Sequence, residues 1–198
     1  MEDTFKKITE LSSIQSENLT KFKDVVEYEI CLLHIEEHID AAILLFKNGF
    51  LDQATFLIIT VLEEISKAEI CIYRGFGGQN KFVKRAKDGL FNHKSKHLAI
   101  ANDITFKYLK TKKLYGKDLI DGILKNLKDG YYISIRENSL YFKNIDGECI
   151  VSDKNITKDS TKILLLICLE IFEDRLFGFS DQTDIITDRV LSKYNDIL

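Results

Sequence analysis

The chain has 198 residues, a formal net charge of -3, 45% hydrophobic residues and 30% charged residues. This length and composition predict one globular domain over residues 1–198 and exclude wholesale disorder. The slightly negative charge excludes a global attraction to nucleic acid or anionic lipid, so any RNA-binding surface has to be a local basic patch.

The first half of the sequence predicts three helices. Residues 1–12 are expected to form a short amphipathic arm or helix, and a second helix runs from Ser16 to a stop at Asn48-Gly49. Its apolar residues recur at helical spacing: Val25, Leu32, Ile35, Ile39, Ala42, Ile43 and Phe46. A third helix is capped by Asp52 and runs to about Arg74. Residues 54–62 in it are apolar on every side, so either its own domain or a partner subunit must surround them, and we expect a homodimer.

The second half predicts four more helices and a small hairpin. The helices span residues 93–113, 117–135, 157–177 and 181–198. Asp146-Gly147 lies between two β-prone runs and predicts a β-hairpin near 140–151. Gly75-Phe-Gly-Gly78 follows no strand, so a turn is favoured over a phosphate-binding loop. The fold class is therefore mainly α, with long antiparallel helices and one hairpin.

The cysteines and the N-terminus indicate a cytoplasmic protein. Cys31, Cys71, Cys149 and Cys168 are widely spaced, which predicts buried free thiols in a reducing compartment. The N-terminus has no apolar secretory segment, and no apolar stretch is long enough to cross a bilayer. We therefore expect no membrane partner.

Four histidines occur as two pairs with i, i+4 spacing, His34/His38 and His93/His97. The string His34-Ile-Glu-Glu37-His38 matches the His-x-x-Glu-His pattern of a class of metalloproteases. The motif is short, and nothing downstream provides a further acidic ligand. We expect this pair to lie on the polar side of a surface helix, with no metal and no other cofactor, and a metal-dependent hydrolase ranks third among the functions considered.

The segment Phe91-Asn-His93-Lys94-Ser-Lys96-His97 is the main candidate for chemistry. A histidine can transfer the proton of an RNA 2′-hydroxyl, and a lysine can stabilise the charge that develops on the phosphorane. The alternative for this segment alone is a solvated basic helix start.

Two carboxylates lie where the apolar helix becomes polar. Glu63 and Glu64 are expected to be half-buried there and to need cationic partners. A local pair of Glu63 with Lys67 would satisfy one of them, whereas Glu64 points about 100° away. Arg136 and the 93–97 segment are the other candidate partners.

Three stretches of the chain combine into a more specific pattern. They are Asn48-Gly49-Phe-Leu-Asp-Gln-Ala54 continued by Val61-Leu-Glu63-Glu64-Ile-Ser66-Lys67-Ala68, then Phe91-Asn-His93-Lys94-Ser-Lys96, then Ile135-Arg136-Glu137-Asn-Ser-Leu140-Tyr141-Phe. In order and spacing they resemble the AbiV family of abortive-infection proteins, over roughly residues 35–175. This family belongs to the HEPN superfamily, whose members are mostly helical bundles that often dimerise.

The resemblance implies antiphage defence by abortive infection, in which the infected cell loses gene expression before the phage replicates. Together with the basic segments it leads us to expect catalytic roles for His93, His97, Lys94, Lys96, Arg136 and Glu64, phosphate binding by Lys94, Lys96, Arg136, Arg85 and Lys84, and orienting roles for Glu63, Lys67, Glu137 and Tyr141. The expected partners are a second copy of the chain, RNA or the translation machinery, and a phage-encoded activator.

The sequence departs from the family and superfamily patterns at two points. Ser66 stands where the family prefers glycine, which is a small-for-small change. The Arg-x4–6-His signature of HEPN nucleases is missing, because Arg85 lies too far before His93 and no histidine follows Arg136. Two hypotheses stay open: a metal-independent RNA endonuclease that uses His93 or His97 as general acid or base, and a non-enzymatic module that is activated by a phage protein and blocks translation by binding.

Overall fold

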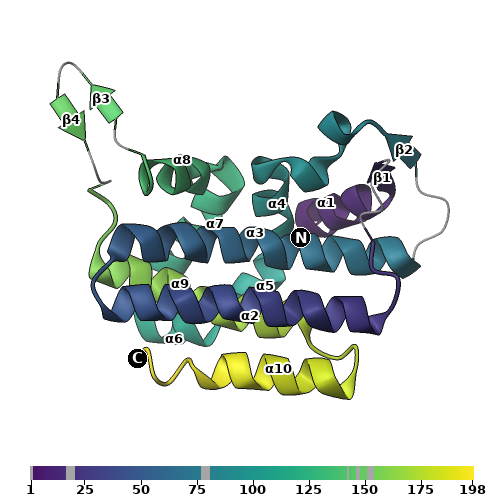
Figure 1. The fold of residues 1–198 in the computed structure, drawn as a ribbon. Coiled ribbons are helices and arrows are strands. Elements are labelled where there is room, and N and C mark those ends of the chain that lie inside the picture. The colour runs from purple at the N-terminus through teal and green to yellow at the C-terminus, as the bar shows by residue number, and fades with distance from the viewer. Residues whose placement is uncertain (1, 17–20, 77–80, 142, 146–147, 151–153) are drawn as a thin grey trace.

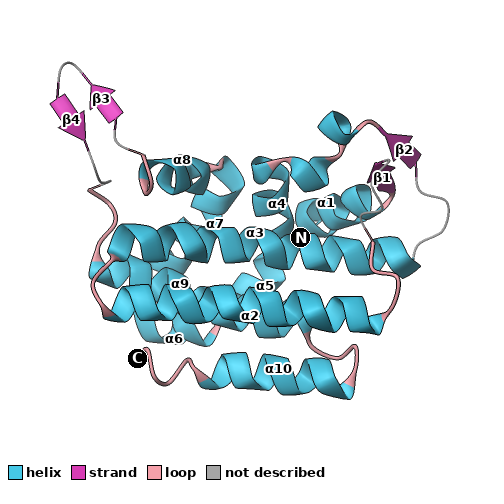
Figure 2. Ribbon diagram, viewed as in Figure 1, coloured by secondary structure: helices cyan, strands magenta, loops and turns pink. Residues whose placement is uncertain are grey.

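The computed structural model describes residues 2–16, 21–76, 81–141, 143–145, 148–150 and 154–198, and within them the fold is mainly α-helical (Figures 1 and 2). In chain order the helices are α1 (Glu2–Ser12), α2 (Val25–Lys47), α3 (Leu51–Phe76), α4 (His93–Ile100), α5 (Asp103–Tyr108), α6 (Lys110–Tyr115), α7 (Lys117–Asp129), α8 (Tyr131–Asn138), α9 (Lys158–Leu176) and α10 (Asp181–Ser192). The strands are β1 (Ile14–Ser16), β2 (Lys81–Val83), β3 (Lys143–Ile145) and β4 (Glu148–Ile150). Two short 3-10 turns, Arg85–Lys87 and Gly89–Phe91, precede α4.

Helix α3 lies at the centre of the bundle. It packs lengthwise against α2 and α9, and α10 covers α2 and α9 on the far side. In the view of Figure 1, the short helices α1, α4 and α8 lie above α3 and contact it from that side. The chain therefore builds a layer of long helices with a second layer of short helices across α3.

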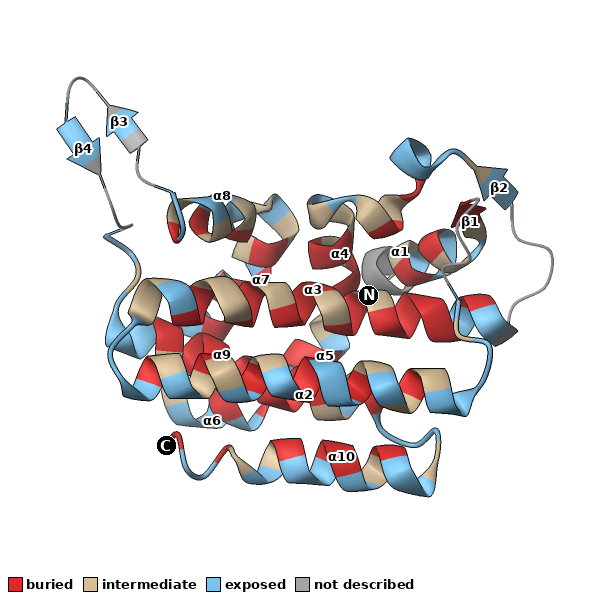
Figure 3. Cartoon of the chain, in the orientation of Figure 1, coloured by how far each residue is buried: buried red, intermediate tan, exposed pale blue. Residues whose placement is uncertain are grey.

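Most of the apolar half of α3 is buried by its own chain, and the buried residues of this helix are red in Figure 3. Ile58, Ile59 and Leu62 are at most 1% exposed within the single chain. The sequence predicts that residues 54–62 are covered either by their own domain or by a partner subunit. In the structure their own domain covers them. Burial of this helix therefore no longer supports a homodimer.

Helix α2 begins later than predicted. The sequence predicts a start at Ser16, but the helix starts at Val25, because the side chain of Asp24 accepts a hydrogen bond from the backbone N–H of Glu27 and caps it. Ser16 instead ends β1, which pairs in parallel with β2. The predicted end at Asn48-Gly49 is confirmed, and Gly49 has a φ of 80° there.

Two predicted helices are divided into shorter ones. The helix predicted over 93–113 is broken at Ala101-Asn102, where the Asn102 side chain accepts from the N–H of Ile104 and starts α5, and again at Leu109. The helix predicted over 117–135 is broken at Gly130, which has a left-handed φ of 80° and ends α7. These breaks let α4 and α8 each lie across α3 in a direction of its own.

Much of the C-terminal half follows the prediction, but α10 ends at Ser192 rather than at 198. β3 and β4 pair antiparallel, with Asn144 opposite Cys149, while the predicted Asp146-Gly147 turn lies outside the described residues. Thr157 and Ser160 form a capping box at the start of α9. The four cysteines are free thiols, but only Cys71 and Cys168 are buried; Cys31 is half-buried and Cys149 is exposed. Among the described helices, none combines the length and the apolar character that crossing a bilayer requires.

The glycine at the α7–α8 junction makes a direct test of this break. Gly130→Ala is expected to lower the free energy of unfolding by about 1 kcal/mol, because a side chain is strained at positive φ. Gly122→Ala is the matched control: Gly122 lies inside α7 with open space around its Cα, so alanine should stabilise the protein by about 0.5–1 kcal/mol. Urea denaturation measures both changes, and equal effects at the two glycines would contradict the helix break.

Candidate functional site

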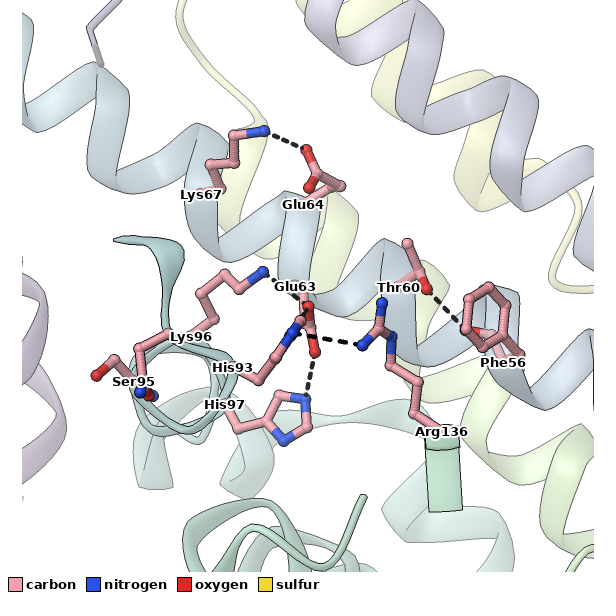
Figure 4. Close-up of polar contacts among 11 residues, drawn as sticks. Phe56, Thr60, Glu63, Glu64, Lys67, His93, Ser95, Lys96, His97 and Arg136 are labelled. Carbon is pink, nitrogen blue, oxygen red and sulfur yellow. Dashed lines mark hydrogen bonds and ion pairs between the residues drawn. The ribbon is translucent and has the colours of Figure 1, made fainter. Parts of the chain in front are cut away.

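The candidate site lies where α4 crosses α3. Asn92 caps α4 by accepting a hydrogen bond from the N–H of Ser95, which fixes the helix start directly before His93. Because side chains at i, i+3 and i+4 share one helix face, His93, Lys96 and His97 all point towards α3 (Figure 4). The residue that they meet there is Glu63.

Three basic side chains contact the carboxylate of Glu63. Its Oε2 lies 2.7 Å from Nδ1 of His93 and 2.7 Å from Nζ of Lys96. Its Oε1 lies 3.2 Å from Nε2 of His97, an ion-pair contact. Glu63 is 2% exposed, so this charge is removed from solvent and depends on these neighbours.

The neighbours keep Glu63 ionised. Burial alone would raise the pKa of its carboxyl group, but the contacts from His97, Lys96 and His93 outweigh burial and lower the pKa to about 2. An ionised carboxylate can only accept hydrogen bonds. Glu63 therefore holds the ring of His93 with the Nδ1 proton pointing into the protein.

Arg136 completes the site from α8. Its Nη1 lies 3.5 Å from Nε2 of His93, and its guanidinium carbon lies 5.1 Å from the centre of the Phe56 ring (Figure 4). A guanidinium has no acceptor, so Nε2 of His93 presents its lone pair on this side. The His93 side chain is 42% exposed, which gives an oriented imidazole at the surface beside a fixed cation.

This arrangement suits proton transfer next to an anion. With Nδ1–H held by the carboxylate, Nε2 of His93 carries the basic lone pair. This lone pair faces Nη1 of Arg136, so a bound group has to displace that contact before Nε2 can take its proton. The guanidinium beside it can hold a phosphate and stabilise negative charge that develops during reaction.

The two neighbouring glutamates have different surroundings. Glu64, for which we expected a catalytic role, points away from α4 and pairs with Lys67, with 2.9 Å between Nζ and Oε2. Lys67 was the expected local partner of Glu63, but in the structure Lys67 pairs with Glu64. Glu64 does not join the cluster around Glu63, because consecutive helical residues point about 100° apart. Lys67 lies one turn beyond Glu63 but has its ammonium group on Glu64.

Two residues predicted to act on RNA are buried. His97 is 0% exposed and Lys96 is 7% exposed, with its ammonium group bound to Glu63. Neither can touch a substrate in this conformation, so the expected direct contacts of these two residues with RNA do not follow from the geometry. Their position instead makes them neighbours that hold Glu63.

The other predicted residues lie on the surface. Lys94 is exposed next to the site, whereas Lys84 and Arg85 lie near β2, where the Arg85 guanidinium stacks 4.2 Å above the Phe91 ring. Glu137 and Tyr141 are exposed at the end of α8 and just beyond it. Within the described residues, none of these last four contacts the Glu63 cluster.

Phe56 is the residue that the sequence analysis missed. It lies seven residues before Glu63 on α3, two turns along the same face, and supports Arg136 by its ring. That spacing was the available signal, but the position looked like part of the apolar core.

The second histidine pair has a local role. Nδ1 of His38 donates a hydrogen bond to the carbonyl oxygen of His34, and the two rings lie 4.4 Å apart. Over the ranges that the structure describes, no three His, Cys, Asp or Glu side chains form a group that could hold a metal ion.

The lowered pKa of Glu63 predicts a stability loss at acid pH. Its pKa of about 2 in the folded protein lies below the usual 4.5, so its contribution is complete above about pH 4.5 and is lost as the pH falls towards 2. The full difference corresponds to about 3 kcal/mol. Urea denaturation at neutral pH and at about pH 3 should show a smaller pH dependence for Glu63→Gln than for the unsubstituted protein. Equal pH dependence would contradict the ionised cluster.

Comparison with known proteins adds one match. The family model HEPN_AbiV, described as AbiV, matches residues 27–171, which include Glu63, His93 and Arg136. No curated protein and no solved structure matches the chain.

Proposed function

Because the chain belongs to the AbiV family of HEPN proteins, we propose that it acts in antiphage defence by abortive infection and does so by attacking RNA in the cytoplasm. The observation that supports RNA attack is the oriented imidazole of His93, held by Glu63 on one side and flanked by Arg136 on the other. Loss of RNA would stop gene expression in the infected cell before the phage replicates.

The proposed reaction is an intramolecular transesterification. Nε2 of His93 takes the proton of a ribose 2′-hydroxyl, the 2′-oxygen bonds to the adjacent phosphorus, and the bond from phosphorus to the 5′-oxygen breaks. The products are a 2′,3′-cyclic phosphate and a 5′-hydroxyl, whose oxygen takes its proton from water; the hydroxide that this leaves takes the proton from His93 and restores the imidazole. Arg136 stabilises the phosphorane charge, and the exposed Lys94 holds a neighbouring phosphate.

A homodimer is part of this proposal. The support is now the outer face of α2, where Val26, Ile30 and Leu33 recur at helical spacing and are 57%, 60% and 41% exposed. Sedimentation at micromolar concentration tests it, with a dimer expected. Because an unrestrained ribonuclease would kill its own host, we also propose that a phage-encoded protein triggers the activity.

One observation favours a second candidate, a non-enzymatic module that blocks translation by binding. Lys96 and His97 are buried against Glu63, so in this cluster only His93 presents an imidazole to solvent. A surface with one oriented imidazole and nearby cations can hold RNA or a ribosomal component without cutting it.

An incubation of purified protein with labelled RNA separates the two candidates. The RNA is followed with extract from infected cells and with extract from uninfected cells. Cleavage that is lost in His93→Ala supports the nuclease. Growth arrest that survives His93→Ala, without any cleavage by the unsubstituted protein, supports the binding module.

A further inference from the structure

A cavity of about 260 Å³ is lined by residues of α3, α7, α8 and α9. Asn126 of α7, Tyr131 of α8 and Thr161 of α9 are among its lining residues. Sites that enclose drug-sized ligands measure about 300–1,000 Å³, so this cavity has room for one ring system rather than for a whole nucleotide.

The cavity and the candidate site share their framework. Thr55 of α3 and Ile135 of α8 line the cavity, and their neighbours in sequence, Phe56 and Arg136, stack on each other in the candidate site. A link also runs over the N-terminus of α8: a Cβ added at Gly130 would lie 3.9 Å from Cγ and Cδ of Lys94. Lys94 therefore lies beside the residue that precedes Tyr131.

The lining selects for a neutral, planar ligand with polar edges. None of the described residues that line the cavity is charged, although charged residues make up 30% of the sequence. This excludes a phosphate or a carboxylate as the preferred occupant, because neither would find a counter-charge. Tyr131 supplies a ring that is 36% exposed, and stacking on aromatic rings is how proteins hold unpaired bases.

The polar groups of the cavity suit the edge of a base. Asn126 carries an amide with two donors and one acceptor oxygen, and it still has capacity after its hydrogen bond with Tyr132. The hydroxyl groups of Thr55 and Thr161 lie 3.0 Å apart and are hydrogen-bonded to each other on the α3–α9 side. The remaining hydrogen-bonding capacity of the Asn126 amide would go unused against an apolar peptide side chain, which favours a base over a peptide.

We propose that this cavity binds one unstacked nucleobase of the RNA whose backbone lies at His93. The inference deepens the proposed RNA function and rests on it, since it assigns base recognition to a surface separate from the reacting groups. Tyr131 stacks on the base, and Asn126 reads its edge.

Nucleoside binding to the purified full chain tests the cavity without any cleavage. Saturation-transfer NMR with adenosine, guanosine, cytidine and uridine should detect binding of at least one of them. Tyr131→Ala should weaken that binding about 5- to 100-fold, as expected for a lost stacking ring. Leu119→Trp, which places a large side chain at a 45% exposed position of the lining, should block it.

Two controls keep this test separate from the test of function. Tyr108→Ala removes a tyrosine that is 70% exposed on α5, outside the cavity, and should leave nucleoside binding unchanged. His93→Ala should also bind nucleosides normally. Nucleoside binding without RNA cleavage would support the cavity as a base-binding site and would contradict the proposed reaction. Cleavage without nucleoside binding, or equal binding by Leu119→Trp, would overturn the cavity assignment.

Discussion

Replacing His93 with alanine is expected to reduce RNA cleavage by about 10²- to 10⁴-fold, the usual contribution of a positioned general base. The imidazole is the only group in the described part of the site that is both oriented by a buried carboxylate and open to solvent. Initial rates on a labelled RNA, measured with extract from infected cells, give the change directly. Growth arrest after infection should be lost in parallel.

The control for this substitution is His34→Ala. His34 is an exposed histidine on α2, away from the α3–α4 crossing, so its loss should change neither the cleavage rate nor the growth arrest. Thermal unfolding should show that His93→Ala is folded, because the side chain is partly exposed. A cleavage rate that is the same in both variants would remove His93 from the reaction.

Replacing Glu63 with alanine is expected to lower the free energy of unfolding by about 3–5 kcal/mol, as for other buried ion pairs that lose one partner. Lys96 would keep a buried ammonium group without its carboxylate, and His97 would lose its only close charged contact described here. Urea denaturation measures the loss. The additional substitution Lys96→Met should recover part of the stability, because it removes the uncompensated charge.

The neighbouring glutamate provides the matched control. Glu64→Ala should change the free energy of unfolding by less than about 1 kcal/mol, because its pair with Lys67 is partly open to solvent. The recovered Glu63→Ala/Lys96→Met variant should still be inactive, since His93 loses its orienting partner. Similar losses in the free energy of unfolding for Glu63→Ala and Glu64→Ala would contradict the assignment of Glu63, rather than Glu64, to the buried cluster.

The long helices could be predicted because local signals mark them. Helical spacing of apolar residues identified α2, a run that is apolar on every side identified α3, and a strongly apolar stretch identified α9. The stop at Asn48-Gly49 was visible in the sequence, whereas the capping box at Thr157 was not predicted. The breaks at Asn102 and Gly130 were missed because the apolar pattern continues through both, although an asparagine cap and a left-handed glycine mark them locally. Three-residue strands such as β1 and β2 are too short to show an alternating pattern.

The candidate site could be predicted in part. Helix α3 becomes polar partway along its length, and α4 begins with basic residues. These two features indicated that a carboxylate of α3 would contact imidazole and ammonium groups of α4. Which glutamate would do so depends on how α4 crosses α3, and Glu63 and Glu64 offer the same chemistry. Burial of Lys96 and His97 could not be foreseen either, because lysine is rarely buried unless a partner such as Glu63 is fixed by the fold.

The ends of the RNA products test the central claim, that His93 acts as the base in an intramolecular transesterification. Purified protein, activated with extract from infected cells, is mixed with labelled RNA in the presence of EDTA, and the new termini are identified by mass spectrometry. The account predicts 2′,3′-cyclic phosphates and 5′-hydroxyl groups. Intact RNA, or 3′-hydroxyl ends paired with 5′-phosphates, would contradict it.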